Sequence, residues 1–216
     1  MKQNHWFTPR DGEVEYFKKT ASHHSQRELD VVIGAAHRGE LTEQQFRQLV
    51  RADFMSAFAM RMIYCYEVSW AVYTTEWIHD IARMLKGQKV LEIGAGRGIL
   101  GKVMPALTGA EWICTDPIPP EGADHVIAMR ANRAVDQYDP DVVFASWVPY
   151  RSTLDYHMAR RKPCVFVGET EWGCTGSTAF WREGEGQDFR VEYPDIQDVP
   201  QWSGIHDCTF RTFPTS

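Results

Sequence analysis

The sequence predicts an α/β protein with an open, doubly wound and mostly parallel sheet of seven strands, preceded by an N-terminal helical cap. Short apolar runs alternate with helical segments after residue 87, which is the pattern of a parallel sheet with crossover helices. Helical periodicity dominates the preceding residues. With 216 residues, 44% of them hydrophobic, the chain is long enough to bury a sizeable core.

Three parts of the chain differ in their residue pattern. Residues 1–40 are polar and irregular apart from a short helix expected at about 26–36, and we expect them to form an arm or a lid. Residues 41–86 form the helical cap, and residues 87–216 form the core. The cap and the core are expected to make a single globular unit.

The cap is expected to contain two helices. One carries an apolar stripe of residues four apart, which we expect in the core: Phe46, Val50, Phe54, Phe58 and Met62. A second helix begins near Thr74 or Thr75, because either hydroxyl can cap it, and Gly87 ends it. This helix buries Trp77, Ile78, Ile81 and Leu85.

Seven apolar runs after the cap have the length of strands. They cover residues 89–93, 111–115, 125–129, 141–145, 163–167, 190–193 and 208–213. A helix at 99–107 follows the first of them. Ligands of open parallel sheets bind beyond the carboxyl ends of the strands, so residues directly after each strand are the candidates for chemistry.

A glycine-punctuated turn follows the first strand, in the run Val90–Gly98 that spells Val-Leu-Glu-Ile-Gly-Ala-Gly-Arg-Gly. Alternate glycines let the backbone turn sharply and approach a ligand, and the free amides that open the next helix hold a carboxylate. Glu92 at the strand tip adds an acceptor that orders the loop or reaches an amino group through water. These features predict an S-adenosylmethionine (SAM) site that includes Glu92, Gly94, Ala95, Gly96 and Gly98.

Two alternatives apply to the same turn. Residues 96–101 also match the dinucleotide pattern glycine-x-glycine-x-x-glycine, which would indicate a nicotinamide-dependent oxidoreductase. In dinucleotide folds the first glycine follows the strand directly, and here Gly94 already occupies that place, so the register favours SAM. The plainer alternative is a glycine-rich turn without a ligand.

The next two strand ends complete the predicted cofactor site. Asp116 ends the second strand about twenty residues after the glycine turn, where a carboxylate accepts both ribose hydroxyls. Pro117 follows it and is assigned to the same site, although the pair also suits a plain turn. After the third strand, a backbone amide and the apolar Ala131 are candidates to hold adenine.

The turn after the fourth strand reads Ser146-Trp147-Val148-Pro149-Tyr150. It resembles the Asp/Asn/Ser-Pro-Pro-aromatic motif of amino-group methyltransferases, with Val148 in place of the first proline and either Trp147 or Ser146 at the polar position. We therefore assign Ser146 and Tyr150 to catalysis and Trp147 to the cofactor pocket. Tyr66 and Trp70 of the cap are expected to line that poorly hydrated pocket.

Carboxylates follow the fifth and precede the seventh strand. Glu169 is a candidate to orient the acceptor or take its proton, and a cap for a helix starting near Thr178 is the alternative. Glu171 lies in the same glycine-rich loop. His206 beside Asp207 forms a possible base only if it faces the pocket.

From about Tyr66 onward the chain resembles class I SAM-dependent methyltransferases, which have a Rossmann-like fold. More narrowly, it is similar to a group of small members with a Trp-Pro-Pro-Tyr-like turn. The segments that carry this resemblance are Tyr66–Ala71, Trp147–Tyr150, Gly168-Glu169 with Gly173-Cys174-Thr175, and Pro200–Asp207. The resemblance implies in-line methyl transfer from SAM, with S-adenosylhomocysteine (SAH) as product, to a small-molecule or protein acceptor. DNA or RNA amino-group methylation, and a non-methylating SAM binder or SAM lyase, are the alternatives.

The composition of the chain disfavours some classes of binding partner. The net charge of −6 and pI near 5.7 disfavour nucleic acid without excluding it. No stretch is long and apolar enough to span a bilayer, so we expect no membrane partner and a cytoplasmic location. The five cysteines are scattered without ligand spacing, and we expect reduced thiols and no metal site. The oligomeric state does not follow from the sequence.

Overall fold

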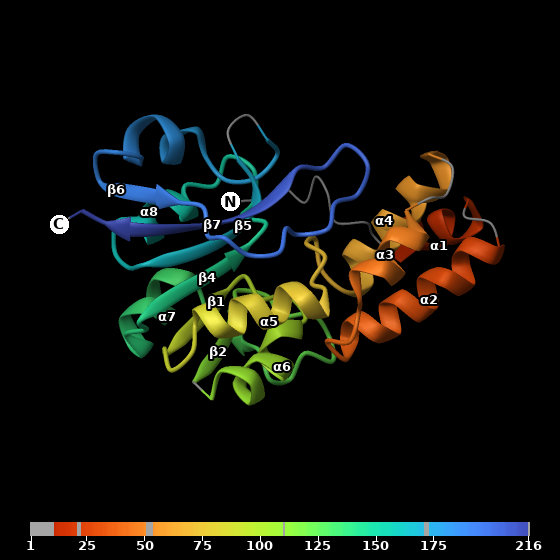
Figure 1. The fold of residues 1–216 in the computed structure, drawn as a ribbon, viewed down its shortest axis with the longest axis horizontal. Coiled ribbons are helices and arrows are strands. Elements are labelled where there is room, and N and C mark those ends of the chain that lie inside the picture. The colour runs from red at the N-terminus through yellow and green to blue at the C-terminus, as the bar shows by residue number, and fades with distance from the viewer. Residues whose placement is uncertain (1–10, 21–22, 51–53, 110, 171–172, 216) are drawn as a thin grey trace.

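The computed structural model describes residues 11–20, 23–50, 54–109, 111–170 and 173–215 (Figure 1). Its strands form one sheet in the order β3-β2-β1-β4-β5-β7-β6. Their bounds are β1 (Val90–Ile93), β2 (Trp112–Asp116), β3 (Ile127–Ala128), β4 (Val142–Ser146), β5 (Cys164–Glu169), β6 (Phe189–Glu192) and β7 (Asp207–Pro214). Strands β1 to β5 are parallel, and β7 is antiparallel to both of its neighbours. The prediction of a mostly parallel seven-stranded sheet is confirmed.

The helices are α1 (Asp11–Thr20), α2 (His23–His37), α3 (Glu43–Leu49), α4 (Phe54–Glu67), α5 (Thr75–Met84), α6 (Ile99–Thr108), α7 (Ala131–Tyr138) and α8 (Leu154–Ala159), with a π-helical turn at Phe180–Gly184. Side chains of α5 and α6 pack on one face of the sheet, against Val90 and Phe144. Those of α7 and α8 pack on the other face, against Leu91 and Val143. The sheet is therefore doubly wound, as expected.

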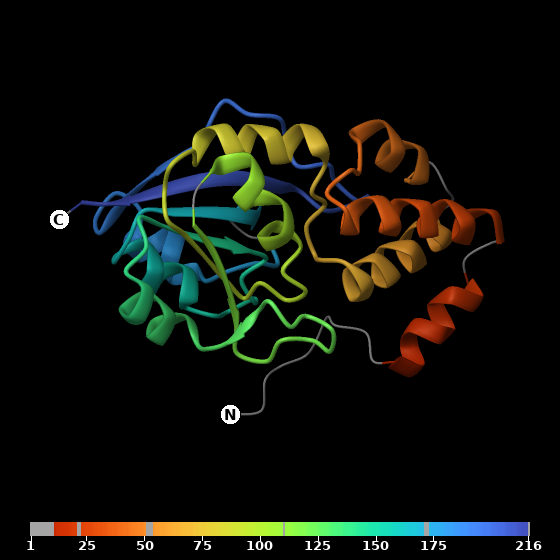
Figure 2. The same ribbon diagram turned by 90° about the horizontal axis from the view of Figure 1, so that it is seen from below.

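Helices α1 to α4 gather at one end of the molecule, beyond the sheet (Figures 1 and 2). The expectation that residues 1–40 are irregular outside 26–36 is wrong for their described part, which forms α1 and α2. Leu29, Val32 and Ala36 of α2 are buried in the same cluster as Val14 of α1 and Tyr64 of α4. A few apolar residues at helical spacing thus anchor a mostly polar segment.

The continuous apolar stripe from Phe46 to Met62 is also wrong. Helix α3 ends at Leu49 and α4 begins at Phe54. Because these are two helices, a spacing of four residues does not place side chains of both on one common face. Phe46 is buried, whereas Phe58 is 43% exposed. The buried face of α4 is made instead by Ala59, Met60, Ile63 and Tyr64. The side chain of Phe54 lies outside the described part.

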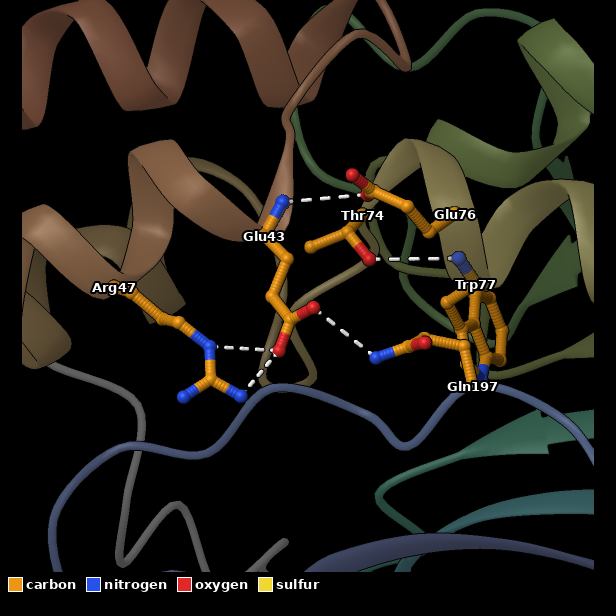
Figure 3. Close-up of polar contacts among 6 residues, drawn as sticks. All are labelled: Glu43, Arg47, Thr74, Glu76, Trp77 and Gln197. Atoms are coloured by element: carbon orange, nitrogen blue, oxygen red, sulfur yellow. Dashed lines mark hydrogen bonds and ion pairs between the residues drawn. The ribbon is translucent and has the colours of Figure 1, made fainter.

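Helix α5 begins where its cap predicts. The Trp77 N–H donates to Thr74 Oγ1 at 3.4 Å, and Trp77, Ile78, Ile81 and Leu85 are buried. Figure 3 shows how the neighbouring α3 is tied to α5 and to the segment before β7. The Glu43 amide donates to the Glu76 carboxylate at 3.2 Å, and Gln197 Nε2 donates to the Glu43 carboxylate at 3.1 Å. These bonds join α3 to α5 and to the connection between β6 and β7.

Candidate functional site

The loop between β1 and α6 is held in the left-handed region at three alternate glycines. Gly94, Gly96 and Gly98 have φ values of +65°, +53° and +63°. A Cβ on Gly98 would meet His125 Nε2 at 2.5 Å, whereas a Cβ on Gly94 or Gly96 would meet no atom within 4 Å. The loop is thus pressed against the β2–β3 connection at its far end and has open space at its first two glycines. Such a backbone is able to approach a ligand closely.

Asp116 fastens this loop to the end of the neighbouring strand β2. Its Oδ2 accepts the Gly96 N–H at 3.0 Å, and its Oδ1 accepts the Ile118 N–H at 2.8 Å. The Ala95 N–H also donates to the Thr115 carbonyl at 3.0 Å. Each carboxylate oxygen has a further lone pair, so the partly buried Asp116 retains acceptor capacity. The next residue, Pro117, is exposed.

Glu92 lies in the core. Its carboxylate is 4% exposed, and its Oε2 accepts Trp112 Nε1–H at 2.8 Å and the Cys114 thiol at 3.2 Å. Burial raises the pKa of Glu92 to about 7, against the lowering effect of these two hydrogen bonds. The side chain therefore joins β1 to β2. Its assignment to the cofactor stays a prediction.

The cap meets the glycine loop at the end of α4. Arg97, within the loop, donates from Nε to the Tyr66 carbonyl at 3.3 Å, and its guanidinium lies 6.0 Å from the centre of the Tyr66 ring. Tyr66 is therefore beside the loop, and its assignment to the cofactor pocket stays a prediction. Arg97 was not among the expected residues, although its place inside the glycine run is a signal for it.

The β4 end carries Trp147 in a left-handed conformation, with φ +52°. The Trp147 N–H donates to the Val167 carbonyl at 2.7 Å, and its ring stacks on Trp70 with centroids 5.3 Å apart and planes 23° apart. Its indole Nε1–H donates to Asp207 Oδ2 at 3.0 Å. Non-glycine residues with positive φ need support from their surroundings, and these three contacts provide it.

Asp207 is a buried carboxylate with unused acceptor capacity. It is 2% exposed, and its Oδ1 has no hydrogen-bond partner. Burial raises the pKa of Asp207 to about 7; the Trp147 bond and the Arg61 charge oppose this shift, and the Glu169 charge adds to it. The guanidinium of Arg61 lies 5.7 Å and 5.5 Å from the ring centres of Trp70 and Trp147. Arg61 was missed, although it interrupts an apolar helix.

Glu169 pairs directly with Asp207 across β5 and β7. Its Oε2 accepts the Cys174 N–H and thiol, each at 2.7 Å, and its Oε1 accepts the His206 N–H at 3.2 Å. Desolvation acts to raise the pKa of Glu169, but these hydrogen bonds and the charge of His206 outweigh it, and the pKa is lowered. Glu169 is therefore an ionised group that orders its loop. It does not cap a helix near Thr178.

Other expected residues are more dispersed. Tyr150 is 54% exposed, with the Arg151 guanidinium 5.2 Å from its ring centre. Ser146 lies beside the buried Tyr73 phenol, whose pKa is raised by burial. Ala131 is the first residue of α7 and packs against the core on the face of the sheet that α7 and α8 cover. His206 is exposed, and Glu171 lies outside the described residues.

Two negative findings concern the described residues only. Among them, no group of three His, Cys, Asp or Glu side chains is placed to hold a metal ion. Of the helices that the structure describes, none has the length and apolar character needed to cross a membrane. The five cysteines are free thiols, and Cys65, Cys114 and Cys164 are buried.

Comparisons with known proteins found similarity among solved structures. No protein-family model matches the chain, and no curated protein matches it. A mutant of MtNAS is 12% identical over 95% of this chain and 77% of its own, with a TM-score of 0.43. An O-methyltransferase of neocarzinostatin biosynthesis, solved with SAM, is 12% identical over 88% and 69%, with a TM-score of 0.43. The mitomycin 7-O-methyltransferase MmcR is 13% identical over 95% and 74%, with a TM-score of 0.40.

Proposed function

We propose that the protein is a SAM-dependent methyltransferase that acts on a small molecule or a protein side chain. The observation that carries the proposal is the loop Gly94–Gly98, which has open space at its first two glycines and is bonded through Gly96 to Asp116. The loop follows β1, whose neighbours β2 and β4 lie on opposite sides of it. This is the switch point at which open α/β sheets bind ligands.

The residues around the loop fit the parts of SAM. Backbone amides at the start of α6 suit the methionine carboxylate, because a helix N-terminus favours an anion. The remaining lone pairs of Asp116 suit the two ribose hydroxyls. The segment between β3 and α7, which includes Ala131, is the candidate for adenine, and Met129 there donates its N–H to the Asp116 carbonyl at 3.0 Å.

The bound cofactor would supply a methyl group activated by a sulfonium. The chain has to align donor and acceptor and keep water out. We assign that role to Tyr66 of the cap, to Trp147 of the β4 end and to Trp70, on which Trp147 stacks. Loss of the positive charge on sulfur during transfer favours such a poorly hydrated surface.

The β4 turn does not favour a nucleobase amino group as acceptor. Trp147 stands at the polar position of the amino-group motif, and its indole N–H is used by Asp207. Ser146 faces Tyr73 instead. We keep the relationship to the small group with a Trp-Pro-Pro-Tyr-like turn as part of this proposal, on the evidence of residues 147–150.

A pair of glycine substitutions separates ligand contact from backbone strain. Gly96→Ala adds a Cβ in the open space of the loop, whereas Gly109→Ala adds one at the other end of α6, with φ +63° and no atom within 4 Å. Left-handed strain should cost each variant about 1 kcal/mol of stability. We expect SAM affinity measured by calorimetry to fall at least about 30-fold for Gly96→Ala only. Equal affinities of the two variants would contradict a cofactor site at this loop.

Activity is tested by transfer of a labelled methyl group from SAM to small molecules or proteins of a cell extract. Labelled product would support the proposal. Tight SAM binding without any transfer would count against methylation, and release of methylthioadenosine without an acceptor would identify a lyase.

A further inference from the structure

At the carboxyl end of β4, the strand next to β1, a positive side chain lies against two tryptophans, and one of these donates to a buried carboxylate. Arg61 projects from α4, Trp70 precedes α5, Trp147 follows β4, and Asp207 opens β7. The two rings stack, and the guanidinium lies 5.7 Å and 5.5 Å from their centres. Aromatic faces backed by a carboxylate are the surroundings in which proteins bind organic cations.

With Arg61 in place, two polar atoms of this cluster still have no hydrogen-bond partner. Its Nε is buried without a hydrogen-bond partner, and so is Oδ1 of Asp207, whose Oδ2 accepts the Trp147 indole N–H. Buried polar atoms are nearly always paired in folded proteins, so this cluster has one donor and one acceptor with hydrogen-bonding capacity left for a ligand. The guanidinium of Arg61 lies at the end of a long, flexible side chain, so it is able to move out of the cluster.

The other ionisable groups near the cluster favour the binding of a cation. Glu169 lies opposite Asp207 in the antiparallel register, and its lowered pKa keeps it ionised. Cys174 and Cys65 also feel the Arg61 charge, but burial raises the pKa of both thiols to about 12, so they are neutral near pH 7. Arg61 therefore supplies the positive charge that acts on Asp207, whereas the positive charge that acts on Glu169 is that of His206.

We propose that Trp70, Trp147 and Asp207 form the subsite for a cationic group of the acceptor, an ammonium or a guanidinium, and that Arg61 occupies this subsite until the acceptor displaces it. The inference rests on the proposed function for the identity of the ligand as acceptor. It adds the chemical class of that acceptor. A neutral acceptor group would leave Asp207 without the positive charge that Arg61 supplies once that side chain moved.

The test uses butylammonium and butylguanidinium as probes and neutral butylurea as the control, in calorimetric titrations of the full chain with saturating SAH. Arg61→Met removes the competing charge and keeps an apolar stem. We expect it to bind both cations at least tenfold more tightly than the wild type, with no gain for butylurea. The double variant Arg61→Met with Asp207→Asn should lose the gain, while the Asn oxygen still accepts the Trp147 N–H.

Arg83→Met is the matched control, because it removes one positive charge from a side chain that is 79% exposed on α5. It should bind the probes as the wild type does. If Arg61→Met fails to fold, Arg61→Lys carries the same test, since its shorter ammonium vacates part of the space over Trp147. We expect at least a threefold gain for that variant.

Three results would overturn the inference while leaving the proposed function intact, provided SAH still binds. They are an equal gain for butylurea, no gain for either cation, and a gain that survives Asp207→Asn. Probes that compete with SAM but not with SAH would assign the subsite to the cofactor sulfonium and overturn the acceptor assignment. Failure of the wild type to bind SAM and SAH would instead overturn the proposed function.

Discussion

Replacing Asp116 with alanine is expected to weaken SAM and SAH binding by about 100-fold or more. The change removes the carboxylate that we assign to the ribose and also the bond that holds Gly96. Two hydrogen bonds to a charged group are together worth about 3 kcal/mol, which corresponds to about a hundredfold in affinity. Calorimetric titration with both sulfur nucleotides measures the effect.

Asp141→Ala provides the matched control for this experiment. Asp141 also accepts a hydrogen bond from a backbone amide, that of Lys89 at 2.8 Å. This bond lies at the amino ends of β1 and β4, at the opposite end of the strands from Asp116. We expect similar losses of stability for the two alanine variants and unchanged nucleotide binding for Asp141→Ala. An Asp116→Ala protein that binds SAM like the wild type would refute the ribose assignment.

Glu92→Gln is expected to stabilise the protein above pH 7.5 by about 1–3 kcal/mol. The pKa of Glu92 is about 7 in the folded chain and near 4.3 in an unfolded one. Between these values the native state holds a proton that the unfolded state has released, so wild-type stability falls as pH rises through that window. A glutamine oxygen still accepts the Trp112 N–H and carries no charge to desolvate.

Denaturant unfolding of both proteins from pH 4 to pH 8.5 measures this effect. The stability difference should be smallest near pH 4 and grow towards pH 7.5. Asp207, whose pKa is also raised to about 7, contributes the same trend to both proteins and so cancels in the difference. A Glu92→Gln protein that is less stable at pH 8, or a difference independent of pH, would show that Glu92 is not a desolvated core carboxylate.

The sheet could be predicted because its signals are local. Each buried strand is a short apolar run, and Gly94–Gly98 marks the turn into α6 by its composition alone. Thr74 likewise predicts the start of α5, because its hydroxyl caps the helix. The helical end was harder to predict, because the anchoring residues of α1 and α2, such as Leu29 and Val32, are few among polar neighbours. The break between α3 and α4 also shifted the buried face of α4.

The site contacts were less predictable, because most of them join distant segments. Trp70 and Trp147 were expected separately, and their stacking depends on how the cap meets the end of β4. Glu169 was expected to act on the acceptor, which stays a prediction, and the hydrogen bonds that its oxygens accept from Cys174 and His206 could not be read from the sequence. The opposition of Glu169 and Asp207 follows only from the antiparallel register of β5 and β7.

Calorimetric titration of the wild-type protein with SAM, SAH and NAD tests the central proposal most directly. We expect both sulfur nucleotides to bind with dissociation constants in the micromolar range, on the order of ordinary cofactor and substrate affinities, and NAD not to bind. Absence of binding by SAM and SAH, or a preference for NAD, would contradict a SAM site at the Gly94–Gly98 loop.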